Sequence, residues 1–269
     1  MKGIVRHFVV VMGCMGMMFS SAYADSAASN SQSNSQAAFG SSSGKTESAG
    51  DSGRFGIGVK TSFLGVGAEI GARVTHRTNA RVGFNILGYS RNFSKDGINY
   101  GGHLSFRTFE AHYDFFPRAG NFHISPGVLA YMGNPVTANA IVPGDQSFSL
   151  GGQTYYSDPS APATANGRVN FNQVSPTATI GWGNLVRRSS KHISIPVELG
   201  VAFQGSPKST LNLTGNVCNA PSGSLLRSCM STSNSTVQSN VVAEQSKINK
   251  SVSAFKVYPI ISVGFGYKF

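Results

Sequence analysis

Apolar residues alternate with small or polar residues along eight separate segments of this chain, and this alternation constrains its fold most. In the last segment, Val263, Phe265, Tyr267 and Phe269 occupy every second position, with serine, glycine and lysine between and before them. Because successive side chains of a strand point to opposite faces, this pattern predicts strands with one apolar face. The eight predicted strands cover residues 54–62, 66–75, 80–92, 100–116, 122–132, 172–184, 192–205 and 254–269.

The connections between these segments alternate in length. Residues 76–79, 117–121 and 185–191 form short turns, whereas a modest loop lies near 93–98 and two long segments span 135–169 and 207–252. Short turns at one end and long loops at the other are typical of a transmembrane up-and-down β-barrel. We therefore predict an all-β, antiparallel transmembrane barrel over residues 54–269 with eight strands. Hairpins inside the long segments leave ten strands as an alternative.

The N-terminal region precedes the alternating segments and has a different composition. Residues 1–24 carry Lys2 and Arg6, a short apolar run and the small-residue sequence Ala22-Tyr23-Ala24, which predicts a secretory signal peptide. Lipid attachment at Cys14 is an alternative. Residues 25–53 are rich in Ser, Asn and Gly, and predict a disordered periplasmic leader. The later sequence contains no run of about 20 apolar residues, so it predicts no transmembrane helix.

The charge and cysteine content narrow the possible partners. The chain has a formal charge of +11, but only 12% of its residues are charged and 32 are glycine, which does not suit a soluble α/β enzyme. An exported basic protein is expected to meet anionic lipid or lipopolysaccharide and no nucleic acid. Cys218 and Cys229 remain after signal cleavage, so we predict a disulfide between them, with two free thiols as the alternative.

Four stretches carry a resemblance to a known class. "VKTSFLGVGAEIGARVTHRTNARVGFN", "TIGWGNLVRR", "FQGSPKSTLNLTGN" and "FKVYPIISVGFGYKF" resemble small bacterial outer-membrane β-barrel proteins of the OmpA and OmpW type. More closely, they resemble a group of small outer-membrane barrels with no assigned function. The resemblance covers residues 54–269. It implies location in the outer membrane of a Gram-negative bacterium, with the long loops outside the cell. It implies no catalytic residue and no cofactor.

The C-terminal residues extend this resemblance. Val263, Phe265, Tyr267 and Phe269 resemble the C-terminal insertion signal that the barrel assembly machinery reads in this class, which implies that machinery as a partner during biogenesis. Two features depart from the class. The loop between Cys218 and Cys229 has no counterpart in the general pattern, and no peptidoglycan-binding domain follows the barrel. We expect a monomer.

The alternation of side chains along each strand places a set of charged residues on the inner face of the predicted barrel. Eight strands enclose an interior just wide enough for side chains to fill. Two interpretations of this set stay open: a salt-bridge network that plugs the lumen, and the filter of a narrow path for a small solute. The register near residues 107–109 is expected to slip. The predicted lumen charges are Lys60, Glu69, Arg73, Arg81, Glu110, His112, Asp114, Glu198 and Lys256.

Other motifs carry weaker functional hypotheses. His123-Ile124-Ser125 and His192-Ile193-Ser194 place His and Ser on one strand face, as an acyl-transfer site requires, but both follow short turns at the periplasmic end. We interpret them as structural, and no Cys and His spacing predicts a metal site. We therefore predict a non-enzymatic structural barrel or narrow small-solute porin. The alternatives are a surface-loop binding or adhesion module and a lipid-modifying barrel enzyme.

The two long segments have predicted structure of their own. Segment 135–169 contains turn-like sequences that indicate a hairpin extending above the membrane. In residues 235–252, Val237, Val241, Ile248 and Val252 follow helical spacing, which predicts a short amphipathic helix before the last strand. We expect this helix to pack on the barrel mouth.

Overall fold

Eight strands close into an antiparallel barrel in the computed structural model, which describes residues 53–118, 120–133, 136–187 and 191–269. The predicted signal peptide and leader lie outside these residues, apart from the last leader position. Neighbouring strands pair in the order β1-β2-β3-β4-β5-β10-β12-β16, and β16 pairs with β1 again. The barrel strands are β1 (Phe55–Ser62), β2 (Gly65–Thr75), β3 (Thr78–Lys95), β4 (Ile98–Phe115), β5 (Phe122–Tyr131), β10 (Val174–Trp182), β12 (Val197–Phe203) and β16 (Val257–Lys268).

The first and last strands complete the barrel wall. Strand β16 pairs with β1 over the register from Gly56↔Lys268 to Ser62↔Ser262, and its other edge pairs with β12. A two-residue strand, β11 (Ile193–Ser194), continues toward β12 across Pro196 and also pairs with β16. Closure with eight strands confirms the predicted fold class, and the ten-stranded alternative is wrong.

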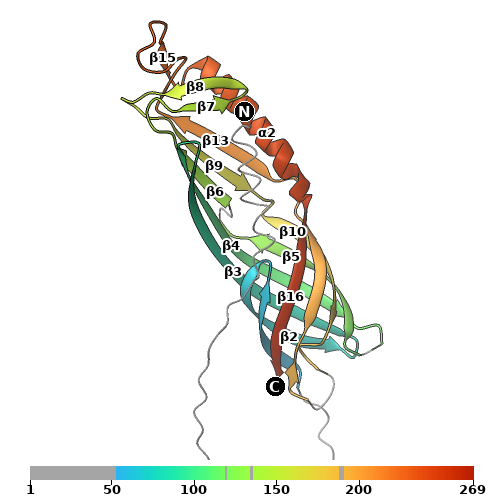
Figure 1. Cartoon of the computed structure of the whole chain (residues 1–269). Coiled ribbons are helices and arrows are strands. Elements are labelled where there is room, and N and C mark those ends of the chain that lie inside the picture. Colours follow the sequence, from blue (N-terminus) through green and yellow to red (C-terminus); the bar gives the residue numbers. More distant parts are fainter. Residues whose placement is uncertain (1–52, 119, 134–135, 188–190) are drawn as a thin grey trace, which may run out of the picture.

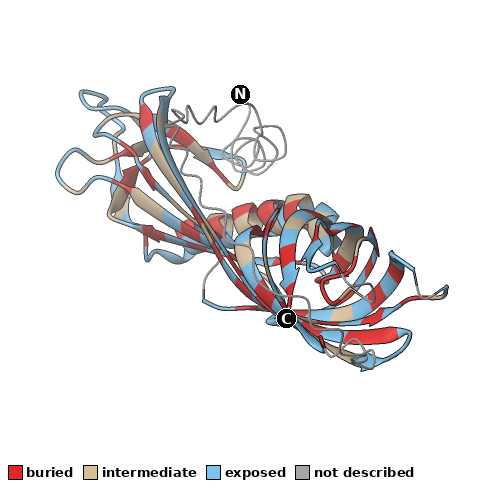
Figure 2. Cartoon of the chain, turned by 90° about the horizontal axis from the view of Figure 1, so that it is seen from below, coloured by how far each residue is buried: buried red, intermediate tan, exposed pale blue. Residues whose placement is uncertain are grey.

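The outer surface of the barrel is apolar. Side chains alternate between buried and exposed positions along the barrel strands, as the banding in Figure 2 shows. Large apolar side chains occupy the exposed positions, and the exposed fraction reaches 68% at Val66 and 64% at Trp182. In water this surface would be strongly unfavourable, whereas hydrocarbon accepts it.

Aromatic side chains collect at the end of the barrel that holds the short turns. Phe122 and Trp182 lie opposite each other on β5 and β10, with ring centroids 6.4 Å apart. Tyr267 and Phe269 form an edge-to-face pair at the C-terminus, with centroids 5.3 Å apart. Such aromatic belts mark the level of a membrane–water interface in transmembrane barrels. Within the described residues, none of the helices combines the length and the hydropathy needed to cross a membrane.

The β3–β4 hairpin rises far beyond the rest of the barrel at its other end (Figure 1). Both strands have 18 residues, and their register is continuous from Thr78↔Phe115 to Lys95↔Ile98. The hairpin turns at Asp96-Gly97, where both residues have positive φ, of 51° and 75°. This is the backbone conformation that a two-residue hairpin turn requires, and Asp-Gly adopts it readily.

Strand β4 serves two different partners along one edge. Its lower half, from Thr108, pairs with β5 inside the barrel wall, whereas Asn99–Leu104 pair with β6 (Val136–Ile141). Strands β9 (Thr164–Asn170) and β13 (Lys208–Thr214) continue this sheet outward from β6. The two long segments therefore extend the barrel wall as a sheet.

A second, smaller sheet lies at the far tip. Strands β7 (Ser147–Leu150) and β8 (Gln153–Ser157) form the predicted hairpin, with the positive-φ pair Gly151-Gly152 as its turn. Strand β14 (Asn216–Cys218) joins β8, and β15 (Cys229–Ser231) joins β14. Cys218 and Cys229 lie directly opposite each other and form the predicted disulfide.

Helix α2 (Ser235–Val252) matches the predicted helix in both bounds. Asn234 caps its N-terminus, because the Asn234 side chain accepts a hydrogen bond from the Thr236 N–H at 2.9 Å. The helix packs on β13 of the extension and not directly on the barrel mouth (Figure 1). We call β6 to β9, β13 to β15, α2 and the upper half of the β3–β4 hairpin the surface module. Its apolar side faces α2 through residues such as Leu211 and Leu213.

Two expectations about side-chain facing are wrong. The register does not slip near residues 107–109, because Arg107 stays outward and Thr108 inward within an unbroken ladder. Lys256 does not face the lumen. It ends the 3-10 helix η2 (Ser253–Lys256), where alternation does not apply, and its side chain is exposed.

Candidate functional site in the barrel lumen

Arg81 on β3 lies at the centre of a buried ionic network. Its Nε and Nη2 atoms donate to Asp114 Oδ2 at 2.7 Å and Asp114 Oδ1 at 3.0 Å, which is a two-pronged contact. Its Nη1 donates to Glu69 Oε2 at 3.1 Å, and its Nη2 also contacts Glu198 Oε1. Three carboxylates from β2, β4 and β12 thus converge on one guanidinium. The planar five-donor geometry of arginine suits this role, and a lysine would not supply it.

Lys60 on β1 extends the network to the next carboxylates. Its Nζ lies 3.3 Å from Glu69 Oε2 and also contacts Glu110 Oε1. Asn85 Nδ2 lies 3.3 Å from the second oxygen of Glu110. The network of Lys60, Arg81, Glu69, Glu110, Asp114 and Glu198 therefore has two cations and four carboxylates, a formal charge of −2 when the neighbouring histidines are neutral.

Glycines on the inner face leave the room that these long side chains occupy. A Cβ atom at Gly83 would lie 2.9 Å from Glu110 Oε1. At Gly181 it would lie 2.5 Å from His123 Nε2 and 2.9 Å from Glu198 Cγ. Small and large residues thus alternate around the interior, as an eight-stranded barrel needs in order to fill its lumen.

A turn closes the lower end of the lumen. Residues 185–191 were predicted to be a simple basic turn, but Leu185 and Val186 fold inward and are 2% and 0% exposed. Asn184 fixes this turn, because its Oδ1 accepts hydrogen bonds from Asn79 Nδ2 at 2.7 Å and from the Val186 N–H at 3.0 Å. Phe116 is also fully buried, with its ring centroid 5.2 Å from that of His123.

An aromatic layer fills the upper end. Phe106 on β4 contacts the rings of Tyr131, Phe171 and Tyr258, with centroid distances of 5.8, 6.1 and 6.0 Å. The polar ends of these rings are satisfied: Tyr131 donates to Gln204 Oε1 at 2.7 Å, and Tyr258 donates to the Phe63 carbonyl at 2.9 Å. This layer explains why the inner face of β4 changes from charged to apolar above Thr108 without any change of register.

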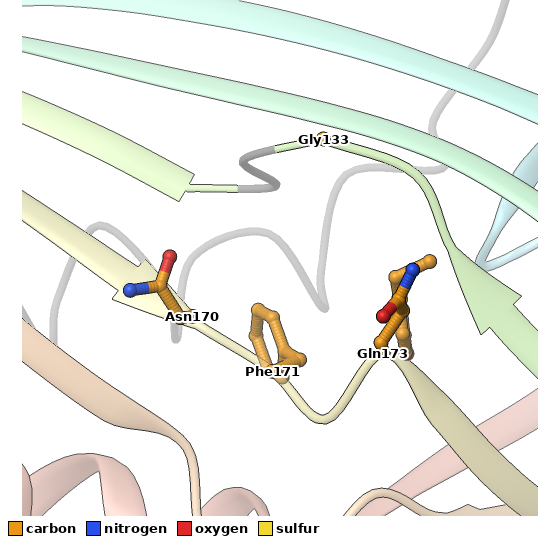
Figure 3. A pocket seen from close by; sticks show the side chains of 5 residues that line it. Gly133, Asn170, Phe171 and Gln173 are labelled. Carbon is orange, nitrogen blue, oxygen red and sulfur yellow. The ribbon is translucent and has the colours of Figure 1, made fainter.

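A small pocket lies beside the aromatic layer, between the end of β5 and the connection from β9 to β10. It has a volume of about 190 Å³ and is lined by Tyr131, Gly133, Asn170, Phe171 and Gln173. Figure 3 shows Phe171 between Asn170 and Gln173 along the connection from β9 to β10. Because Phe171 stacks on Tyr131 at 5.5 Å, the pocket ends against the aromatic layer.

The structure brings most of the predicted lumen charges together. Lys60, Arg81 and the four carboxylates form the network, and His112 Nε2 lies 3.8 Å from Glu110 Oε2 at its side. Arg73 is only half-buried and lies lower, where its Nη2 donates to the Arg187 carbonyl at 3.0 Å. Lys256 is absent from the lumen. Sequence reasoning missed His123, whose Nε2 lies 3.1 Å from Glu198 Oε1, although its parity on β5 places it inward.

The two His-x-Ser motifs are divided between different partners. Ser125 donates to Asp114 Oδ1 at 2.7 Å, whereas His123 contacts Glu198. His192 Nδ1 lies 2.9 Å from the Lys268 carbonyl, and its ring stacks on Tyr267. Acyl transfer by a serine requires a hydrogen bond between the Ser and the His. In the described residues, the Ser and His side chains of these motifs that form hydrogen bonds form them with other groups. Within this part of the chain, no hydrogen bond joins the Ser and the His of either motif.

One further cluster of potential metal ligands lies at the tip of the surface module. Asp158, Cys218 and Cys229 bring their ligand atoms within 4.8 Å of one another. Both sulfurs belong to the disulfide, so neither offers the thiolate that a metal requires. Asp158 instead accepts from Ser160 Oγ at 2.8 Å and lies 3.7 Å from Arg227 Nη2. The disulfide and the contacts of Asp158 thus link neighbouring segments at the tip of the surface module.

A closed eight-stranded barrel with an apolar exterior, an aromatic belt and a packed polar interior is the fold of a small outer-membrane β-barrel protein. Two solved structures are similar to it, both with a TM-score of 0.49. CarO of Acinetobacter baumannii has 17% sequence identity over 80% of this chain and 97% of its own. CarO2 of Acinetobacter baumannii has 14% identity over 80% of this chain and 98% of its own. The sequence matches no family model and no curated protein.

Proposed function

We propose that this chain is a non-enzymatic protein of the bacterial outer membrane whose barrel is closed by its own side chains and holds the surface module outside the cell. The observation that carries the proposal is the position of Arg81. It joins carboxylates of β2, β4 and β12 across the middle of the lumen. Removing the arginine from this network would leave buried carboxylates without a cation, so the closed arrangement is strongly preferred.

The layers above and below the network support the same proposal. The aromatic layer around Phe106 and the inward turn at Leu185 each fill one end of the lumen. A conducting path would require both layers and the ionic layer to move. The surface module, by contrast, is a packed unit with its own apolar core, a helix and a disulfide. Its size and order favour the interpretation that the barrel serves as its anchor.

Single-channel current tests the closed lumen. The full chain is refolded, its folding is verified by heat-modifiable migration on a gel, and it is inserted into a planar bilayer. We expect a silent bilayer at voltages at which a general porin, run as the control, shows regular steps. Reproducible steps from the folded chain would contradict the proposal.

A narrow porin is the second candidate, and the formal charge of the lumen network favours it in one specific form. A network with two cations and four carboxylates would attract cations and repel anions. If steps are observed, their reversal potential in a KCl gradient must therefore indicate cation selectivity. Anion-selective steps would exclude the network as the filter.

Orientation is tested separately from conduction. An epitope inserted between Gly223 and Ser224, at the exposed tip inside the Cys218–Cys229 loop, is expected to be detected on intact cells. The control epitope is inserted after Arg77, in the turn between β2 and β3 at the opposite end. It is expected to be detected only after the cells are opened. The reverse result would place the surface module in the periplasm.

A further inference from the structure

The outward side of the surface-module sheet is left open. Its other side packs residues such as Val169, Leu211 and Leu213 into the core that α2 covers. We call the open side the polar outer face. It consists of the outward residues of β3, β4, β6, β9 and β13 above Ile86, and most of them carry amides or hydroxyls.

Asparagines form a row across this face. Asn92, Gly101, Asn139, Asn166 and Asn212 are direct partners on β3, β4, β6, β9 and β13. With strands about 4.8 Å apart, the row extends over about 19 Å. A Cβ atom at Gly101 would lie 2.4 Å from Asn139 Oδ1 and 3.0 Å from Asn92 Oδ1, so two amides lean over the glycine from either side.

These amides retain their hydrogen-bonding capacity. Among the described residues, the side chains of Asn92, Asn139, Asn166 and Asn212 have no hydrogen-bond partner, and all four are exposed. Each amide offers two donors and an acceptor oxygen. A row of such groups on a sheet face matches a ligand that presents many hydroxyl groups at short spacing.

The charge of the face is positive on the membrane side of this row. Arg168 lies one same-face step below it on β9, and Lys208 lies two steps below it on β13. Arg107 lies lowest, on β4 opposite Ile86, where the apolar exterior of β3 ends. No carboxylate occurs among the described residues of the polar outer face. Across the face as a whole, the order from the membrane outward is therefore apolar barrel surface, then the three cations, then the asparagine row.

We propose that the polar outer face docks the phosphate-bearing sugar head group of an anionic glycolipid in the leaflet around the barrel. Phosphates at the level of the head groups meet Arg107, Arg168 and Lys208, and the sugars above them meet the asparagine row. Charge complementarity selects the anion, and the hydroxyl-rich sugar matches the amides. A protein partner is disfavoured, because Ile141 is the one large exposed apolar side chain among the described residues of the face, and protein interfaces are anchored by such groups.

This inference rests on the proposed orientation, which the epitope experiment tests by itself. Binding is measured by isothermal titration calorimetry on the full chain in phosphatidylcholine nanodiscs. The probe is lipopolysaccharide from which the acyl chains have been removed, so that insertion into lipid does not contribute. Three further probes separate the contribution of the sugar to binding from that of the anion. They are the same sugar after dephosphorylation, inorganic phosphate alone, and nanodiscs containing phosphatidylglycerol.

The charge variant is Arg168→Ala with Lys208→Ala, and its matched control is Lys247→Ala with Lys250→Ala on α2. Both change the formal charge by the same amount. We expect the Kd for the deacylated probe to rise at least about tenfold in the first variant and to change less than about twofold in the control. Equal weakening in both variants would reduce the effect to the net charge and overturn the proposal.

The amide variant is Asn139→Ala with Asn166→Ala. We expect it to weaken binding of both the phosphorylated and the dephosphorylated sugar by about tenfold or more. The affinity of this variant for inorganic phosphate and for phosphatidylglycerol should equal that of the wild-type chain. If the wild-type chain, shown to be folded, binds phosphatidylglycerol as well as it binds the sugar, the face recognises any anionic lipid and the glycolipid proposal fails.

Discussion

The guanidinium of Arg81 meets the carboxylate of Asp114 through two hydrogen bonds inside the barrel, at 2.7 and 3.0 Å, from partners on neighbouring strands. Replacing Arg81 with Met retains most of the volume but leaves Asp114, Glu69 and Glu198 without this cation. Breaking a buried ion pair in this way costs about 3–5 kcal/mol. We expect the free energy of unfolding in detergent, measured by urea titration, to fall by that amount.

The control for this prediction is Arg107→Met. Arg107 is exposed on the outer side of β4, so its loss should change the free energy of unfolding by less than about 0.5 kcal/mol. If the two variants were equally stable, the lumen network would contribute nothing to the fold.

Much of the barrel could be predicted from the sequence because alternation is a local property. The eight strands and helix α2 follow directly from periods that residues such as Val263 and Phe265, or Val237 and Val241, display. Alternation also predicts which face a residue occupies, and it placed Arg81 and Glu198 inward. Lys256 was misplaced because a 3-10 turn interrupts the period just before β16.

The remaining features could not be predicted because they depend on distant partners. Nothing local to Leu185 and Val186 distinguishes an exposed turn from one that folds into a lumen. The register slip expected near residues 107–109 does not occur, and the inner face of β4 instead changes from charged to apolar at Phe106, whose aromatic partners lie on other segments. Strand β4 pairs with both β5 and β6, and this division is set by long-range pairing.

A second prediction concerns the space at Gly181. Its Cβ atom would lie 2.5 Å from His123 Nε2, so Gly181→Ala must displace His123 or Glu198. We expect a loss of about 1–3 kcal/mol in the free energy of unfolding. Gly88→Ala on β3 is the control, since nothing lies within 4 Å of its Cβ position. Equal behaviour of the two alanines in the same urea titration would show that the lumen is loosely packed.

A third prediction concerns the free edge of the extended sheet. The Ser209 N–H donates to Asn249 Oδ1 at 2.7 Å and the Leu211 N–H donates to Gln245 Oε1 at 3.2 Å, so α2 side chains cover the outer edge of β13. Exposed sheet edges pair readily with other chains. We expect Gln245→Ala with Asn249→Ala to speed hydrogen exchange of these two amides by about fivefold per bond lost and to increase aggregation.

The matched control for the edge is Ser246→Ala with Lys250→Ala on the exposed side of α2. It should leave both amides protected, as hydrogen-exchange mass spectrometry of a peptide covering residues 206–215 would show. Unchanged exchange in the Gln245 and Asn249 variant would mean that pairing with β9 alone protects β13.

A fourth prediction concerns acid and the tip of the surface module. Hydrogen bonds from the Ser160 side chain and backbone, together with the nearby Arg227, lower the pKa of Asp158. A lowered pKa in the folded state means that the contribution of Asp158 is present above the ordinary value of about 4 and is lost as pH falls through the folded value. We expect Ser160→Ala to raise the pKa of Asp158, measured by the NMR shift of its carboxyl carbon. The control is Ser246→Ala, which should leave that pKa unchanged. An unchanged pKa in both variants would remove Ser160 as the cause.

The shared edge of β4 limits how this protein can be redesigned. Its lower half is needed to close the barrel, and Asn99–Leu104 are needed by β6. Excising residues 136–170 to obtain a minimal barrel would leave the upper β3–β4 hairpin as a two-stranded ribbon whose β4 edge has lost its partner. A trimmed scaffold must therefore also shorten the β3–β4 hairpin. A foreign binding domain grafted in place of the long segments would need its own strand to occupy that edge.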